Sequence, residues 1–209
     1  MKRAGSLLFS VLAISLMLGI ASGNALAQGD NSVYFVTYYS NARTAGAPSA
    51  VLRLINDGDK STTSTEGVPN GNLWASIYVF DDTQEFQECC SCEVTPDGLT
   101  SEWVNTQLLA NSLTGKVNTR GVIKVVSSST NPGDPTNNTL APGIRAWATH
   151  IQNTKVGDGP QTYAVTETAL ADSNLSSTEN TDLEELCSFS ITLGSGKGVC
   201  SCTPEGSDF

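Results

Sequence analysis

The pattern of hydrophobic and polar residues along the chain is mainly that of short β-strands. β-Branched and aromatic runs are separated by stretches rich in Gly, Asn, Pro and Asp, which favour turns. Leu73–Phe80 has the strongest pattern, with Leu, Ala, Ile and Val on one face and mostly aromatic residues on the other. The predicted strands are Val33–Tyr39, Ala50–Ile55, Leu73–Phe80, Val122–Val126, Ile144–Ile151, Tyr163–Thr166 and Val199–Cys202.

Two segments have a helical pattern. Ser176 and Glu179 have the S-x-x-E spacing of a capping box, which satisfies backbone N–H groups at a helix start and predicts a helix over Ser177–Ser188. A second, shorter pattern over Thr106–Ser112, with Asn105 as its cap, predicts one or two turns. Because strands dominate and do not alternate with helices, we predict a mainly β fold. We expect an antiparallel β-sandwich, immunoglobulin-like or jelly-roll-like, with one or two short helices.

The first 27 residues have the three parts of a secretory signal peptide. Lys2 and Arg3 form a basic start, Leu7–Ile20 is an apolar run, and Ala25–Ala27 is an A-x-A cleavage motif. The run is shorter than the roughly 20 residues that span a bilayer. We therefore predict cleavage between Ala27 and Gln28. The products would be a signal peptide over 1–27 and a single mature domain over 28–209, extracellular or periplasmic and without a membrane span.

Charge narrows the range of functions. The chain has 21 acidic and 11 basic residues and a formal net charge of −10. Nucleic-acid binding needs a basic surface, so this charge argues against a nucleic-acid partner. The chain has one histidine, which excludes a metal site of the three-histidine type.

Six cysteines form the sharpest feature of the sequence. An even number in an exported chain predicts three disulfides. Residues i and i+2 of a strand share a face, so Cys90 and Cys92 should bridge to Cys200 and Cys202, which leaves Cys89 for Cys187. Antiparallel pairing, the commoner arrangement, gives 90 with 202 and 92 with 200, and parallel pairing gives the reverse order. The six are Cys89, Cys90, Cys92, Cys187, Cys200 and Cys202.

The same cysteines have two other interpretations. Four sulfurs from Cys90, Cys92, Cys200 and Cys202 on one patch could bind zinc or copper(I). The C-x-C spacing is shorter than the C-x-x-C of most zinc ribbons, and an oxidising compartment favours disulfides. We therefore favour disulfides and assign no metal, with the metal site as the alternative. A redox-active thiol is the third interpretation, but the neighbouring acidic residues would raise the pKa of a thiol.

An acidic cluster and a lone histidine are the remaining candidates for chemistry. Asp81, Asp82, Glu85 and Glu88 follow the strongest strand, and such carboxylates could hold calcium or hydrolyse glycosides. Solvated turn residues are the simpler interpretation, with calcium as the alternative. His150 could act as a general base, but a single histidine on a strand is more often structural. We therefore assign no catalytic residue.

Two groups of hydrophobic residues bear on binding. The strand Val33–Tyr39 is apolar on both faces, so it is either buried or covered by a partner. Inserted into a neighbouring subunit's sheet it would build a polymer by strand addition, whereas we favour pairing within its own chain. Trp74, Trp103 and Trp147 are spread along the chain, and we expect core packing rather than a carbohydrate platform.

The chain contains the strings Asn41–Pro48, Ile77–Asp81, Glu88–Cys92, Gly143–Trp147, Thr166–Thr168 and Gly198–Cys202. Together they resemble a family of uncharacterised secreted bacterial proteins, chiefly from acidobacteria. The Cys-Cys-Ser-Cys element is the most specific of them, and the resemblance covers most of the chain after residue 27. It implies export and a shared cysteine framework, and it implies no activity.

These features predict a secreted or cell-surface protein without enzymatic activity. Its role would be structural, adhesive or filament-forming, through contacts with a protein partner or with itself by the N-terminal strand. An extracytoplasmic metal-binding protein that uses the C-x-C pairs is the alternative, and a secreted hydrolase is the third hypothesis.

Overall fold

The computed structural model describes residues 32–58 and 71–202, and the structural statements below refer to these residues. The predicted signal peptide and the cleavage site at Ala27 and Gln28 lie outside the described residues.

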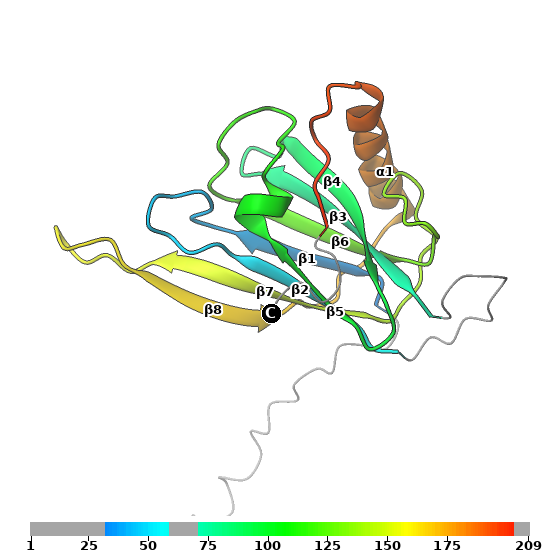
Figure 1. Cartoon of the computed structure of the whole chain (residues 1–209), viewed down its shortest axis with the longest axis horizontal. Helices are drawn as coiled ribbons and strands as arrows, with labels where there is room; N and C mark the ends of the chain where they lie inside the picture. The colour runs from blue at the N-terminus through cyan, green and yellow to red at the C-terminus, as the bar shows by residue number, and fades with distance from the viewer. Residues whose placement is uncertain (1–31, 59–70, 203–209) are drawn as a thin grey trace, which may run out of the picture.

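The described chain folds into two four-stranded antiparallel sheets and one long helix, which confirms the predicted mainly β sandwich (Figure 1). The first and second strands lie in different sheets, so the chain crosses between the layers early. Sheet A has the order β1 (Tyr34–Tyr39), β6 (Gly121–Ser128), β3 (Leu73–Asp81) and β4 (Phe86–Val94). Sheet B has the order β5 (Leu99–Trp103), β2 (Val51–Asn56), β7 (Ile144–Asn153) and β8 (Tyr163–Ala169).

The main core lies between the two sheets. Ile77 and Val79 of β3 belong to the same buried cluster as Leu52 and Leu54 of β2, and none of the four is exposed to solvent. They occupy alternate positions on their strands, so each pair points from one face of its strand toward the other sheet. Burial of each large side chain stabilises the fold by about 1.5–3 kcal/mol, so this alternation fixes which faces of the sheets meet.

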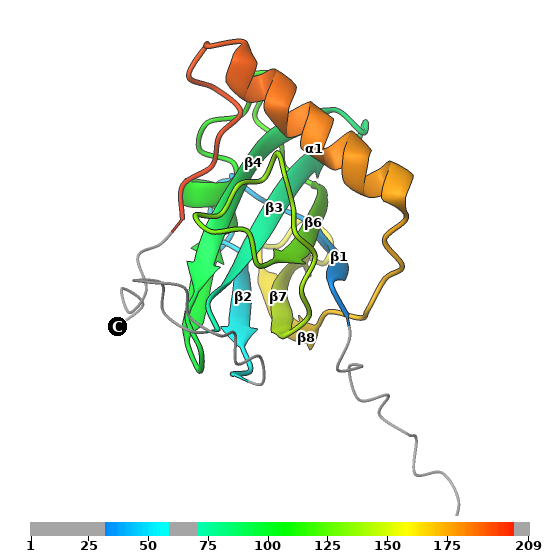
Figure 2. The same ribbon diagram turned by 90° about the vertical axis from the view of Figure 1, so that its right-hand side faces the viewer.

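Helix α1 (Ser177–Thr192) crosses the outer face of sheet A (Figure 2). It begins where predicted, because the Ser176 hydroxyl accepts a hydrogen bond of 3.0 Å from the Glu179 N–H. The Glu179 carboxylate accepts hydrogen bonds from Tyr34 of β1 and Lys124 of β6, and thereby fixes the helix start to the sheet. Leu183 is buried against the same sheet in a second, smaller hydrophobic cluster.

The second predicted helix, over Thr106–Ser112, is wrong in type and position. The structure has a five-residue π-helix, η1 (Val104–Leu108), preceded by Trp103 and without a side-chain cap. Val104 and Leu108 are both buried in the main core. Packing of these two side chains, rather than a capping residue, sets where the turn lies.

The predicted strands differ from the structure in three places. The sequence pattern missed β4 and β5, because both are rich in Cys, Ser, Thr, Glu and Gln rather than in alternating aliphatic residues. The predicted last strand over Val199–Cys202 is reduced to a single parallel bridge between Val199 and Cys89. That segment lies along the outer edge of β4 and is held there mainly by disulfides, as described below.

The N-terminal strand β1 pairs with β6 of its own chain. The register is antiparallel and covers all six residues, from Tyr34 opposite Val126 to Tyr39 opposite Gly121. This is the intramolecular pairing that we favoured. In the described part of the chain, no helix combines the length and the apolar character needed to cross a membrane.

Candidate functional site

The cysteines of β4 alternate between the two faces of sheet A. Cys90 and Cys92 belong to the main core, whereas Cys89 lies in the smaller cluster beneath α1. The structure contains three disulfides, and no described cysteine is free. The pairs are Cys89–Cys187, Cys90–Cys200 and Cys92–Cys202.

The partners were predicted correctly, but the favoured order, with Cys90 bridged to Cys202 and Cys92 to Cys200, is wrong. The C-terminal segment runs parallel to β4: the Cys89 N–H donates to the Gly198 carbonyl, and the Cys200 N–H donates to the Cys89 carbonyl, both at 3.0 Å. Cys187 ties the end region of α1 to Cys89, so the following segment returns beside Cys89. From there it continues in the direction of β4, which brings residue 200 to 90 and residue 202 to 92.

The cysteine cluster also contains the one group of potential metal ligands found among the described residues. The sulfurs of Cys90, Cys92 and Cys202 lie within 4.8 Å of one another, and those of Cys90 and Cys92 are 4.0 Å apart. Zinc and copper(I) bind thiolates, and each of these sulfurs is held in a disulfide. A metal site would therefore require reduction of both bridges.

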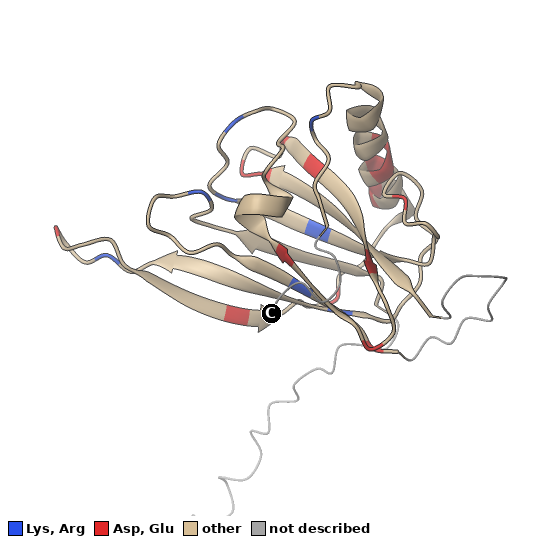
Figure 3. Ribbon diagram, in the orientation of Figure 1, with Lys and Arg blue, Asp and Glu red and all other residues tan. Residues whose placement is uncertain are grey.

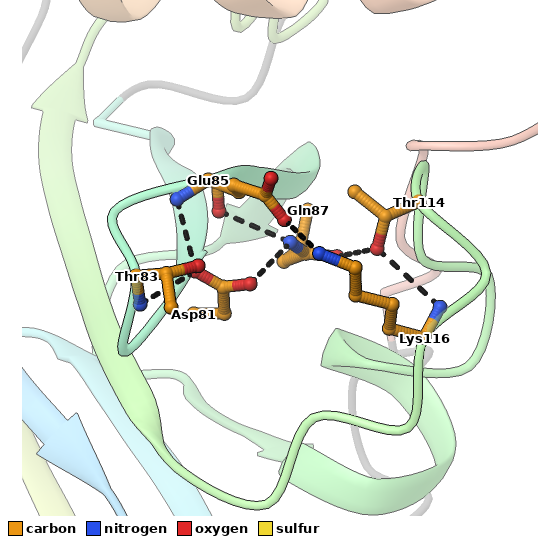
Figure 4. Close-up of polar contacts among 6 residues, drawn as sticks. All are labelled: Asp81, Thr83, Glu85, Gln87, Thr114 and Lys116. Carbon is orange, nitrogen blue, oxygen red and sulfur yellow. Dashed lines mark hydrogen bonds and ion pairs between the residues drawn. The ribbon is translucent and has the colours of Figure 1, made fainter.

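Asp81 organises the acidic turn between β3 and β4 (Figure 4). One carboxylate oxygen accepts hydrogen bonds from the N–H groups of Thr83 and Glu85, both at 2.9 Å, and from the Thr83 hydroxyl. The other accepts from the Gln87 amide at 3.2 Å. Burial by itself would raise the pKa of Asp81, but the hydrogen bonds from Glu85 and Thr83 outweigh it and hold the pKa below its ordinary value.

The other carboxylates of the predicted cluster point to separate partners. Asp82 pairs with Arg120 and Glu85 with Lys116, each at 2.5 Å and each on the protein surface. Such exposed pairs contribute about 0–1 kcal/mol. Calcium takes six to eight oxygen ligands around one point, and these four side chains do not converge on one. The contacts of these carboxylates are therefore those of a structural turn rather than those of a calcium site.

Glu88 differs from its acidic neighbours because it is fully buried. One carboxylate oxygen accepts from the Asn111 N–H at 2.8 Å and lies 3.4 Å from the Ser112 hydroxyl, while the other has no hydrogen-bond partner among the described residues. Burial raises the pKa of Glu88 from 4.5 to about 7, although these hydrogen bonds and the charge of Arg43 oppose the shift. The sequence placed Glu88 in an acidic turn and gave no signal of this burial.

His150 has the surroundings of a structural residue. It is buried, its ring stacks on that of Tyr38 with centroids 4.2 Å apart, and its Nε2 lies 2.9 Å from the Thr168 hydroxyl. Burial lowers the pKa of His150, and a hydrogen bond with the Tyr38 backbone opposes this in part. Among the described residues, no hydrogen bond or ion pair joins the ring to a carboxylate, which a Ser-His-Asp arrangement would need.

The outer face of sheet B is the feature that sequence reasoning missed. Leu52 and Leu54 of β2 face the core, so Arg53 and Ile55 point to the opposite side. On β5 the same alternation places Trp103 on this outer face, and on β7 it does so for Trp147, which lies opposite Arg53 in the register. The expectation of core packing is wrong for Trp103, which is 43% exposed, and Trp147 is only partly buried.

A groove of about 380 Å³ lies beside the contact between α1 and sheet A and is lined by residues of both. It has an apolar floor that includes Phe80, and the Lys124 ammonium lies 4.9 Å from the centre of that ring. Helix α1 carries acidic residues and no lysine or arginine (Figure 3). The groove is lined by Phe80, Asp81, Gln84, Val122, Lys124, Glu179, Asp182, Leu183 and Leu186.

Comparison with known proteins gives no functional assignment. No protein-family model matches the chain, and no curated protein matches it. One similar solved structure is titled crystal structure of Thermotoga maritima 1070. It is 14% identical, its TM-score is 0.40, and the match covers 70% of this chain and 97% of the other.

Proposed function

We propose that the protein is an exported, non-enzymatic protein with a structural or adhesive role, and that it acts through protein contacts made by the outer face of sheet B. The observation that supports this is the sheet face itself. β2, β5 and β7 bury one side against sheet A, and the opposite side carries partly exposed tryptophans.

The composition of this face is that of a protein contact. Trp103 and Leu99 are 43% and 40% exposed, and tryptophan and arginine are the residues that contribute most to protein interfaces. Arg53 is held 2.7 Å from Glu167, so its charge is already paired beside Trp147. A central aromatic patch with paired charges around it favours a protein partner over a polyanion.

Substitution of Trp103 tests this function. We expect labelled protein to bind intact cells or envelope fractions of the source organism, and Trp103→Thr to weaken that binding about tenfold or more, as for a central interface tryptophan. Val117→Thr is the matched control, because Val117 is 65% exposed and lies in the loop before β6, where the neighbouring Lys116 pairs with Glu85 beside sheet A.

Treatment of the envelope identifies the class of partner. Protease treatment should remove the binding sites, whereas periodate, which oxidises glycans, should leave them. Periodate-sensitive binding would instead assign the face to carbohydrate. Equal binding by the Trp103 and Val117 variants, or none by the parent protein, would refute the proposed role of this face.

Export is supported by the three disulfides, because such bridges persist in oxidising compartments. We expect the protein isolated from its native host to begin at Gln28 and to be found outside the cytoplasm. Intact-mass measurement checks the N-terminus, and cell fractionation checks the compartment. A functional protein that keeps residues 1–27 would contradict the proposal.

Two alternatives have weaker support. Metal binding by the C-x-C pairs is favoured by the closeness of the Cys90, Cys92 and Cys202 sulfurs, and it applies to the reduced protein. A hydrolase built on His150 or the acidic turn has no support from their contacts. The metal content of the purified oxidised and reduced forms separates metal binding from the proposed role.

A further inference from the structure

We propose that the protein forms a symmetric dimer in which β8 pairs antiparallel with β8 of a second copy, so that the two B sheets join into one. This rests on the proposed role in protein contacts and names one partner, a second copy of the chain. The dimer uses the edge of sheet B, whereas the function proposed above uses the outer face of that sheet with Trp103 and Trp147. Either proposal can therefore fail while the other holds.

The backbone of β8 has one row of hydrogen-bonding groups directed away from its sheet. The Leu170 N–H donates to Ala146 of β7, and Thr162 at the other end accepts from Thr154. Even-numbered residues of β8 therefore face β7, as the register of seven pairs without a shift requires. The N–H and C=O groups of the odd-numbered residues point outward, on the last strand of sheet B in the described part of the chain.

Among the described residues, other segments of the chain cover both outer edges of sheet A, whereas none pairs with the outer edge of β8. On β1, Phe35 forms a bridge with Asp172, and the Ser173 N–H donates to the Tyr34 carbonyl. On β4, the disulfide-bonded C-terminal segment bridges at Cys89. The chain thus supplies covers for both edges of sheet A, whereas in Figure 1 β8 runs along the margin of the fold.

The sequence of β8 lacks the usual protection of an edge strand. Natural edges are blocked by lysine, proline or a β-bulge, and β8 reads Tyr-Ala-Val-Thr-Glu-Thr-Ala. Its side chains from Val165 to Ala169 are all exposed. The single charged residue, Glu167, is paired with Arg53 of its own sheet, so it adds little repulsion against a second copy.

The strand is complementary to itself in one antiparallel register. With Thr166 on the twofold axis, the outward backbone groups of Val165 meet those of Glu167 in the other copy, and Tyr163 meets Ala169. Thr166 lies opposite its own counterpart, and threonine pairs across strands are favourable. No like charges lie directly opposite each other, and a twofold contact of this kind uses the same patch on both subunits.

A proline at Val165 tests the pairing. The Val165 N–H points outward, so Val165→Pro keeps the hydrogen bonds to β7 and removes one donor from each copy. We expect the dimer dissociation constant, measured by sedimentation equilibrium, to rise roughly tenfold or more. Val165→Thr, which keeps the N–H and a β-branched side chain, should dimerise like the parent protein, and circular dichroism checks that both variants are folded.

A cysteine at the twofold axis tests the register without relying on the proline variant. Thr166→Cys should form an intermolecular disulfide on mild oxidation, because directly opposed residues of a non-hydrogen-bonded pair lie close enough to be bridged. Ala164→Cys should not, since its counterpart lies several residues away along the strand. A parent protein that stays monomeric at high concentration, equal dimerisation of the Pro and Thr variants, or equal cross-linking at 164 and 166 would overturn the proposal.

Discussion

Removal of one disulfide is expected to destabilise the protein by only about 2–3 kcal/mol, whereas reduction of all three should cost about 10 kcal/mol and unfold it. A bridge that closed a loop of 110 residues alone would contribute about 5 kcal/mol in the chain-entropy model. The three bridges do not act alone, because they close nearly the same loop between β4 and the C-terminal region.

The free energy that each bridge contributes depends on the size of the ring that it closes once the others are in place. With Cys89–Cys187 in place, Cys90–Cys200 closes only the short ring made by the neighbouring residues of β4 and the segment from 187 to 200. Such a ring of roughly 15 residues is worth about 3 kcal/mol. Cys92–Cys202 then closes a ring of a few residues, worth about 2 kcal/mol.

This dependence is tested by the double variants Cys92→Ala/Cys202→Ala and Cys89→Ala/Cys187→Ala. Urea unfolding measures the free energy of unfolding of each variant. Circular dichroism of the fully reduced parent protein gives the combined effect. If each pair removed 4–5 kcal/mol, the bridges would be acting independently. If the reduced protein stayed folded, the hydrophobic core would be sufficient by itself.

Residue types and spacing predicted those parts of the structure that depend on local chemistry. The cap at Ser176 forms within one turn, and β3 alternates strongly enough to be read directly. The disulfide partners also followed, since Cys90 and Cys92 share a face in any strand. Their order did not, because it depends on the direction in which the chain returns after α1, and that direction is a tertiary property.

The candidate surfaces were harder to predict for a similar reason. Trp103 and Trp147 have the sequence surroundings of core residues, and only the position of sheet A decides which face of sheet B is left uncovered. Glu85 and Glu88 are both acidic residues beside the same turn. One pairs with Lys116 on the surface and the other is buried under the loop that contains Asn111, so burial separates their chemistry.

Glu88 is expected to make the protein less stable as the pH rises, which is the reverse of the usual effect of a carboxylate. Its pKa in the folded state, about 7, lies above the ordinary value of 4.5, because burial disfavours the charged form. Between these two values the folded protein binds more protons than the unfolded chain. The stabilising contribution is therefore complete below pH 4.5 and is lost as the pH rises through 7.

Glu88→Gln isolates this effect. Glutamine keeps an acceptor for the Asn111 N–H and places a neutral amide where Glu88 has a buried oxygen without a described partner. The free energy of unfolding of the variant relative to the parent protein should be higher at pH 8 than at pH 4.5, by up to about 3 kcal/mol. Urea unfolding at both pH values measures it, and contributions common to both proteins, such as that of Asp81, cancel in the difference. Glu85→Gln is the matched control, because it removes an acidic residue beside the same turn that is exposed rather than buried. Parallel pH profiles for the parent protein and the Glu88 variant would show that the buried carboxyl does not titrate in this range.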